Sequence, residues 1–398
     1  MTIRNRALAR VGAAMCLTLG AFFFAATPAS AAGTETDLEL TFAGTTLAAN
    51  SYSKSGWVKV TNKGPGTPRE LTINADLSEL DFDKIYPAPT GDGCFEGPEP
   101  TPKEWNCEVP ADRIPGPGET LDLMVVIFKV DAGGPPYSAP VTFRIISPDD
   151  TTADNDTKTV DLVFGPDSGV DLGVTVPDVK ERIDPATGDG GVPLRAGDTT
   201  VTRGTVFNWG DVIAQGIRVT VRLPEHVTFV RSDEECDYSA EGRTATCTYP
   251  TIVLTTVAEY PHQFAVALEW PIVVAAGVEG PVTLPDGSWT VAALGQVPPG
   301  ARIDRTSGDL PENATMVSAD EAGLTEIDES DNADGFAVVV SGEGGGGGGD
   351  NGLPVTGVRA GLLGGVGLAV VVAGGALLLM GRRRKVVLVL PDDGKPTA

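Results

Sequence analysis

Asp328, Asp331 and Asp334 are the residues of this chain best suited to hold a cation. They recur at every third position within an acidic stretch that runs from residue 304 to residue 334. Calcium prefers clustered carboxylate and carbonyl oxygens, so a bound calcium ion can order such a loop. The segment does not fit an EF-hand, because Ser330 stands where that loop needs its first aspartate. A calcium site and a solvated acidic loop therefore both stay open.

Residues that could catalyse a reaction are few. The chain has two histidines, His226 and His262, and it contains no HExxH, GxSxG or Walker A sequence around which an active site could form. The histidines have no ligand spacing for zinc. Glycines 344–349 formally contain GxGxxG, but no strand or helix pattern surrounds them, which indicates a flexible linker. A glycosidase carboxylate pair is not excluded in so acidic a chain. We expect a non-enzymatic protein with no cofactor other than calcium.

The N-terminal residues predict export. Three arginines precede an apolar stretch from Val11 to Ala26, and small residues follow it. This is the order of a secretory signal peptide, so residues 1–31 are expected to be removed by cleavage between Ala31 and Ala32. Exported proteins reach oxidising compartments, where cysteines form disulfides. The cysteines after the leader allow three connectivities; they are Cys94, Cys107, Cys236 and Cys247.

Two copies of one pattern occupy residues 32–167 and 168–340. Each copy opens with an alternating strand, at 37–42 and at 171–176. The cysteines follow at comparable positions in the two copies, which favours pairing Cys94 with Cys107 and Cys236 with Cys247. Alternating strands, scarce helical periods and many turn residues predict an all-β fold of two tandem antiparallel β-sandwiches. Further matches keep one spacing without a gap: Val60, Asn62, Gly64, Leu71, Ile73 and Leu77 correspond to Val206, Asn208, Gly210, Ile217, Val219 and Leu223.

The repeat resembles the immunoglobulin-like domains of bacterial surface proteins, including the adhesion-related type. The likeness covers roughly residues 35 to 340. It implies two immunoglobulin-like sandwiches, a fold that serves many functions. The residues that carry it are Val60-Thr61-Asn62-Lys63-Gly64-Pro65-Gly66, Leu223-Pro224-Glu225-His226-Val227-Thr228-Phe229, and an Asp-Asn element before the last strand of each copy, at Asp154-Asn155 and Asp331-Asn332.

The C-terminal residues predict a membrane span. A glycine-rich linker at 341–352 leads to the pentapeptide at 353–357, then to an apolar run at 360–381 and a basic tail at 382–398. A helix of about 22 residues spans about 33 Å, close to the thickness of a hydrocarbon core. The cluster of cations after the run places the tail in the cytoplasm by the positive-inside rule. The pentapeptide reads Leu353-Pro354-Val355-Thr356-Gly357.

This order resembles the cell-wall sorting signal of Gram-positive surface proteins, which consists of an LPxTG pentapeptide, an apolar span and a positively charged tail. The resemblance implies a sortase that cuts between Thr356 and Gly357 and joins the carboxyl group of Thr356 to peptidoglycan. The implied partners are the sortase, peptidoglycan and, before processing, the membrane. Such signals usually end soon after the cations, whereas this chain continues to Ala398. An ordinary single-pass anchor therefore also stays open.

The charge of the chain excludes one class of partner. Its formal net charge is −25, and the two predicted removable ends carry nine bases and two acids, so the mature chain is more acidic still. Binding to nucleic acid depends on lysines and arginines that neutralise phosphates, so we expect no nucleic-acid partner. A solvated, soluble exterior is the plain explanation of the charge.

Three functions stay open. The first is a wall-anchored, non-enzymatic surface protein whose sandwiches form a structural or adhesive module. The second is a surface receptor module that binds a glycan or a protein. The third is an unprocessed single-pass membrane protein with the same ectodomain. The sequence does not name an extracellular ligand.

Overall fold

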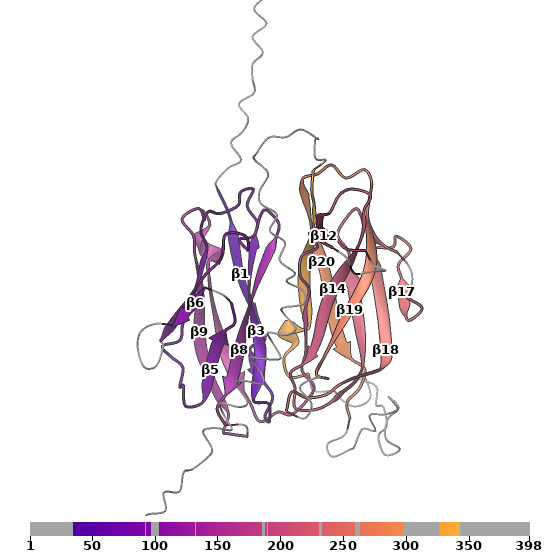
Figure 1. Ribbon diagram of the computed structural model, residues 1–398. Coiled ribbons are helices and arrows are strands. Elements are labelled where there is room, and N and C mark those ends of the chain that lie inside the picture. The colour runs from indigo at the N-terminus through magenta and orange to yellow at the C-terminus, as the bar shows by residue number, and fades with distance from the viewer. Residues whose placement is uncertain are drawn as a thin grey trace, which may run out of the picture.

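The computed structural model describes residues 35–91, 93–96, 103–131, 133–184, 188, 190–230, 233–258, 263–297 and 326–342. Their regular structure is β-strand, with two short 3₁₀ helices, η1 (Ala153–Asn155) and η2 (Glu329–Asp331). The strands form two sandwiches that lie side by side (Figure 1). The predicted all-β fold is confirmed. Both cores lie within the described residues, so this region contains the packing that its folding needs.

Two sheets form the first sandwich. One has the strand order β1-β3-β8-β5, and the other has the order β2-β10-β9-β4-β7-β6. β2 pairs with β10 in parallel, and the other pairs are antiparallel. The strands are β1 (Leu38–Ala43), β2 (Thr46–Leu47), β3 (Ser53–Asn62), β4 (Thr72–Asp76), β5 (Ile85–Pro89), β6 (Cys94–Glu96), β7 (Glu104–Glu108), β8 (Thr120–Lys129), β9 (Tyr137–Ile146) and β10 (Thr157–Phe164).

The second sandwich repeats this plan. Its sheets have the orders β11-β14-β19-β16 and β17-β18-β15-β20-β21, with the short ribbon β12-β13 beside them. Val179 forms a parallel bridge with Val338 of β21, as β2 does with β10 in the first sandwich. The strands are β11 (Leu172–Thr175), β12 (Glu181–Arg182), β13 (Val192–Pro193), β14 (Thr199–Asn208), β15 (Ala214–Arg222), β16 (Val227–Phe229), β17 (Cys236–Tyr238), β18 (Thr244–Leu254), β19 (Ala265–Val274), β20 (Val282–Ala293) and β21 (Ala333–Val340).

Both sandwiches have the strand order of an immunoglobulin fold. In that fold one sheet has the order A-B-E-D and the other contains G-F-C. β1-β3-β8-β5 and β11-β14-β19-β16 match the first sheet, while β10-β9-β4 and β21-β20-β15 match the second. Each sandwich adds a hairpin to strand C, formed by β6-β7 in the first and β17-β18 in the second. The two hairpins thus lie at corresponding sheet edges.

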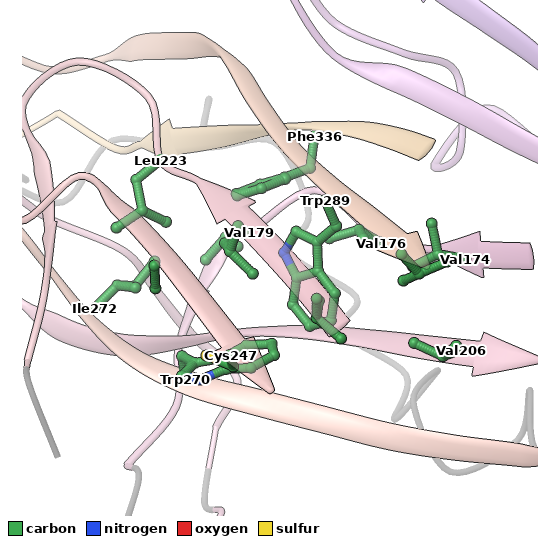
Figure 2. Close-up of a cluster of buried hydrophobic side chains, with 14 of the residues drawn as sticks. Val174, Val176, Val179, Val206, Leu223, Cys247, Trp270, Ile272, Trp289 and Phe336 are labelled. Carbon is green, nitrogen blue, oxygen red and sulfur yellow. The ribbon is translucent and has the colours of Figure 1, made fainter. Parts of the chain in front are cut away.

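Alternation of side chains between core and solvent builds the two cores. Along β15, Ile217, Val219 and Val221 are buried while the residues between them face outward. Figure 2 shows the centre of the second core, where the rings of Trp270 and Trp289 meet edge to face with centroids 4.7 Å apart. A side chain at residue 204 would collide with Trp289, because a Cβ there would lie 2.5 Å from its ring; glycine therefore occupies this position.

The repeated asparagine makes the same bonds in both copies. Asn62 donates from its amide group to the carbonyl of Gly66 and accepts from the backbone N–H of Gly64. Asn208 donates to the carbonyl of Val212 and accepts from Gly210 in the same way. Each side chain is buried and ties the end of a strand to the loop that follows. The repeated Asn-x-Gly of the sequence therefore encodes a hydrogen-bonded corner.

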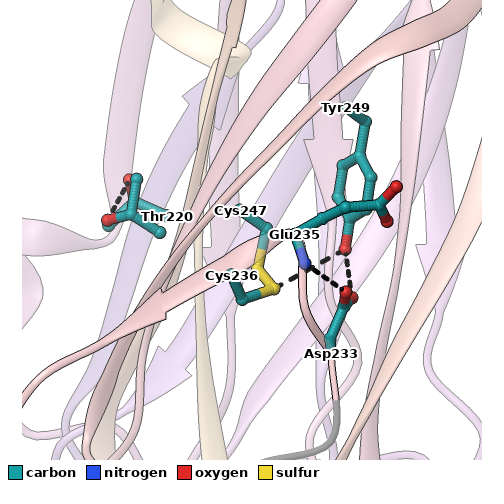
Figure 3. Close-up of a disulfide and its surroundings, with 7 residues drawn as sticks. Thr220, Asp233, Glu235, Cys236, Cys247 and Tyr249 are labelled. Atoms are coloured by element: carbon teal, nitrogen blue, oxygen red, sulfur yellow. Dashed lines mark hydrogen bonds between the residues drawn. A yellow bond between two sulfur atoms is a disulfide. The ribbon is translucent and has the colours of Figure 1, made fainter.

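Disulfides close both edge hairpins with the sequence-local pairing. Cys94 bonds to Cys107 across β6 and β7, and Cys236 bonds to Cys247 across β17 and β18. The partners stand directly opposite each other in the strand register, with Cα atoms 3.9 and 4.0 Å apart. Beside the second disulfide the hydroxyl of Tyr249 donates to Asp233 over 2.8 Å (Figure 3).

Several predictions concern residues outside the described part of the chain. These are the signal peptide with its cleavage site, the linker, the pentapeptide at 353–357, the apolar run at 360–381 and the tail. Among the described residues, none forms a helix with the length and hydrophobicity that a membrane crossing requires.

Candidate functional site

A buried lysine joins the two sandwiches. Lys54 of β3 places its Nζ atom 2.8 Å from both carboxylate oxygens of Asp171, which precedes β11. The same nitrogen lies 3.1 Å from Asp328 and 3.2 Å from Asp331. The side chains of Lys54 and Asp171 are 0% exposed. An ammonium removed from water needs charged partners, and here all of them come from the other sandwich.

Local structure fixes the carboxylates before the lysine meets them. Asp328 caps the first turn of η2 by accepting from the backbone N–H of Ser330. Its other oxygen accepts from the backbone N–H groups of Thr45 and Thr46 in the first sandwich. Asp331 is the last residue of the same 3₁₀ turn. One short turn therefore presents two carboxylates to one lysine and also binds the chain at the start of β2.

A glycine makes room for the lysine stem. Gly44 has a φ of +82°, in the left-handed region that favours glycine. A Cβ at this position would lie 2.7 Å from the carbonyl oxygen of Ser55 and 3.3 Å from Cε of Lys54. The backbone N–H of Gly44 also donates to Oγ of Ser330 in the second sandwich over 3.0 Å. Any larger residue at 44 would disturb both the lysine and the η2 turn.

Protons balance the excess of carboxylates. Burial lowers the pKa of Lys54, but the charges of Asp171, Asp331 and Asp328 outweigh this effect and raise it, so the ammonium stays charged. Burial raises the pKa of Asp331 to about 8. It also raises the pKa of Glu326 to about 8, although the carboxylate of Glu326 accepts a hydrogen bond from the N–H of Leu172.

The other two carboxylates are the ones that carry charge. Burial opposes ionisation of Asp328, yet Lys54 and the hydrogen bonds from Ser330 and Thr46 leave its pKa below the usual value. Burial raises the pKa of Asp171 only to about 6. Burial thus favours the protonated forms of Asp331 and Glu326, while Lys54 and the hydrogen bonds favour the charged form of Asp328.

A second lysine repeats the arrangement further along β3. Lys59 pairs with Asp334 of β21 and lies 3.2 Å from Asp122 of β8. The other oxygen of Asp334 accepts from the backbone N–H of Val176 over 2.7 Å. Burial raises the pKa of Asp122 to about 7. β3 thus contributes two lysines, spaced along one strand, and each of them pairs with at least one carboxylate at 328–334 of the second sandwich.

Further hydrogen bonds extend the contact between the sandwiches. At one end, Asn50 donates from its backbone and side chain to Asp211, and Ser51 donates to the carbonyl of Trp209. At the other end, the N–H of Thr120 donates to Asp178. These bonds flank the two lysine clusters, so the pair of sandwiches behaves as one unit. We call this set of contacts the lysine interface.

The first sandwich has a neutral version of the same turn. Asn155 ends η1 as Asp331 ends η2, and its side-chain amide donates to Asp37 over 2.8 Å. The backbone carbonyls of the next residues, Asp156 and Asn332, each accept a hydrogen bond from a backbone N–H of the neighbouring strand over 2.8 Å. The structural match is therefore one residue out of register with the Asp-Asn match in the sequence. Asp331 has a carboxylate where Asn155 has an amide, so the second sandwich needs the positive charge of Lys54.

The aspartates predicted to bind calcium are divided between the two lysines. Asp328 and Asp331 lie on Lys54, whereas Asp334 lies on Lys59. Calcium binding by these residues stays a prediction. Another group, Asp233 with Cys236 and Cys247, brings possible metal-ligand atoms within 4.8 Å of one another in the described part of the chain, but both of its sulfurs are in the disulfide.

The acidic pattern of the sequence predicts a role for Asp328, Asp331 and Asp334, but it does not mark Asp171 or either lysine. Neither Lys54 nor Lys59 was predicted to matter, because a lysine in an alternating strand is usually exposed to solvent. One signal was present: β3 carries both lysines within six residues, in a chain with far more acids than bases. The predicted sorting residues, Leu353 to Gly357, lie outside the described residues.

Comparison with known proteins gives weak similarities only. No family model matches the sequence, and no curated protein matches it. Among solved structures, the C-terminal domain of the Streptococcus pyogenes antigen I/II-family protein AspA shares 10% identity over 65% of this chain and 95% of its own, with a TM-score of 0.21. The major pilin subunit BcpA of Bacillus cereus shares 12% over 77% and 67%, with a TM-score of 0.21.

An enzyme also appears among the similar structures. Red sea bream transglutaminase shares 8% identity over 65% of this chain and 29% of its own, with a TM-score of 0.20. At such identities and TM-scores these similarities support no conclusion about fold or function. The assignment of the immunoglobulin-like fold rests on the strand order described above.

Proposed function

We propose that this protein is a non-enzymatic surface protein of a Gram-positive cell wall, linked covalently to peptidoglycan through Thr356. Its two sandwiches form a single structural or adhesive module outside the membrane. Before processing, the membrane span holds the precursor with its C-terminus in the cytoplasm. The observation that carries this proposal is the ordered succession of the pentapeptide at 353–357, the apolar run and the cation cluster.

The lysine interface supports a structural role. Its buried acids are bonded to Lys54, to Lys59 and to backbone N–H groups. Two sandwiches joined only by a flexible link would change their relative orientation freely. A pair held together by buried ion pairs keeps one orientation. A fixed module next to a short glycine linker suits a protein that must present one surface away from its anchor.

Digestion of the cell wall tests the anchoring. We expect wall hydrolases to release a chain that begins at Ala32, ends at Thr356 and carries a peptidoglycan fragment, as seen by mass spectrometry. Thr356→Val should abolish the release and leave the protein in the membrane fraction. Val355→Ala is the matched control, because position 355 is the variable one of the motif, and this variant should be released normally.

The chain after the cations favours one alternative. Residues 386–398 extend beyond the point where a sorting signal usually ends. An uncut chain that keeps this tail in the membrane fraction, with Thr356→Val indistinguishable from the wild type, would show that the protein is a single-pass membrane protein with the same ectodomain. Its lysine interface would be unaffected by that outcome.

A further inference from the structure

The outer face of the second sandwich carries two exposed arginines. Arg218 and Arg222 lie four residues apart on the outward side of β15. Both are exposed, and within the described part of the chain neither guanidinium makes a hydrogen bond or an ion pair. Asp237 of β17 lies at the margin, beside Thr246. The neighbours on β15, β18 and β20 are small and uncharged: Thr220, Thr244, Thr246, Thr248, Ser288, Thr290 and Ala292. We call Arg218, Arg222 and these neighbours the arginine face.

The corresponding face of the first sandwich carries the opposite charge. β4, β7 and β9 take the places of β15, β18 and β20 in the strand order. Glu104 and Glu108 occupy exposed outward positions of β7, and Asp76 stands opposite Glu104 on β4. Arg144 of β9 is the base nearby. On corresponding sheet faces, then, one sandwich presents acids, mainly on β7, and the other presents bases on β15.

An exposed aromatic ring lies among these acids. Phe95 of β6 is 50% exposed and stands opposite Asn106, midway between Glu104 and Glu108 on the same face. A large apolar ring in water beside two carboxylates is well suited to bind a guanidinium, which can stack on the ring and pair with the acids. We call Asp76, Phe95, Glu104 and Glu108 the acidic face.

The charges on the two faces have the same spacing. Arg218 and Arg222 are separated by four residues of one strand, and so are Glu104 and Glu108. At about 3.3 Å per residue, each pair spans about 13 Å. The outer faces of two sheets, laid together with β15 along β7, can therefore bring both arginines onto both glutamates at once. A match at two points gives orientation as well as attraction.

We propose that the arginine face of one molecule binds the acidic face of a second copy. None of the contacts of the lysine interface uses either face, so both remain available after the sandwiches have paired. The contact joins two different patches, so a bound pair keeps one free arginine face and one free acidic face. Such heterologous contacts build open chains. The proposal does not depend on wall anchoring, although attachment to one surface would raise the local concentration.

Charge reversal tests the proposal on residues 32–352, which include both complete cores. We expect the wild type to self-associate in sedimentation velocity at low salt and to dissociate as salt rises. Arg218→Glu with Arg222→Glu should weaken association at least tenfold, and Glu104→Arg with Glu108→Arg should do the same. A mixture of the two variants should associate again, because one then carries two acidic faces and the other two basic ones.

Controls separate a specific contact from a general charge effect. Arg182→Glu with Arg195→Glu changes the net charge by the same amount at exposed positions away from the arginine face, and it should leave association unchanged. Phe95→Ser should weaken association while leaving the melting temperature unchanged. A wild type that stays monomeric at low salt would overturn the proposal. So would reversal variants that associate normally, or a mixture that fails to associate although both variants melt like the wild type.

Discussion

Nζ of Lys54 lies 2.8 Å from both carboxylate oxygens of Asp171, although the two residues belong to different sandwiches and neither side chain is exposed. The pair therefore exists only when both sandwiches are folded and docked. A charge buried in this way is strongly destabilising without its partner, so the fold of one sandwich is coupled to that of the other.

Replacing Lys54 with methionine removes the cation and leaves its carboxylates buried together. We expect Lys54→Met to lower the free energy of unfolding by about 3 to 5 kcal/mol, the range for one partner lost from a buried ion pair. Chemical denaturation measures the loss. Lys158→Met, at an exposed position of β10, is the control and should change stability little. Equal stability of the two variants would show that Lys54 is not needed as a counterion.

The protonated acids around Lys54 predict a pH dependence. Asp331 has its pKa raised from 3.8 to about 8, and Lys54, Asp171 and Asp328 are the charged groups that face it. A raised pKa means that the folded state holds a proton that the unfolded state releases. Its contribution to stability is thus complete below pH about 4 and disappears as the pH rises toward 8. Asp328 has a lowered pKa and loses its contribution only in stronger acid.

We therefore expect the wild type to be most stable in mildly acidic solution. Asp331→Asn should flatten the decline between pH about 4 and 8, because asparagine cannot ionise, and it restores the residue type found at Asn155 in the first sandwich. Denaturation midpoints across this range check the slope. Asp161→Asn, exposed on β10, is the control. An unchanged slope in Asp331→Asn would contradict the proposed protonation.

The two edge hairpins should depend on their disulfides to a similar degree. The closed loops separate their cysteines by 13 and 11 residues, so the chain-entropy account gives about 3 kcal/mol for each bond. Cys94→Ser with Cys107→Ser, and Cys236→Ser with Cys247→Ser, should each lower stability by that amount. Denaturation with and without reductant measures it, and reductant should not affect a variant lacking all four cysteines.

Calcium should have little effect on the wild type, because Lys54 already fills the space between Asp328 and Asp331. In Lys54→Met the same carboxylates lack a cation, and we expect calcium to raise the melting temperature of this variant. Calorimetric titration of both proteins checks this, with magnesium as the comparison. Heat and a melting shift in the wild type would instead support direct calcium binding at the predicted aspartates.

Period-two alternation and the matched spacing of Asn62 with Asn208 were sufficient to predict two similar β-sandwiches. Local pairing of the cysteines also followed from the repeat. Trp57 of β3 is only partly buried, whereas Trp105 and Trp209 are fully buried, and nothing in the sequence pattern separates them. A pattern shows which residues alternate; it does not show which sheet face a second domain will cover.

That limit explains the site as well. Residues 53–56 of β3 are buried on both sides, which an alternating strand with one wet face does not predict. The second sandwich covers this part of the strand, and the contact joins residues more than a hundred positions apart. Long-range pairing of this kind depends on how two finished surfaces fit, so neither Lys54 nor Asp171 carries a local signal for it.

The positions of its residues in the sequence determine when the lysine interface can form. The lysines on β3 come early in the sequence, while Asp328, Asp331 and Asp334 come just before or within β21, the last described strand. On the export route proposed above, the first sandwich would keep its lysines in water until the chain up to β21 had crossed the membrane. Docking would then follow the passage of β21, which ends 13 residues before the pentapeptide at 353–357.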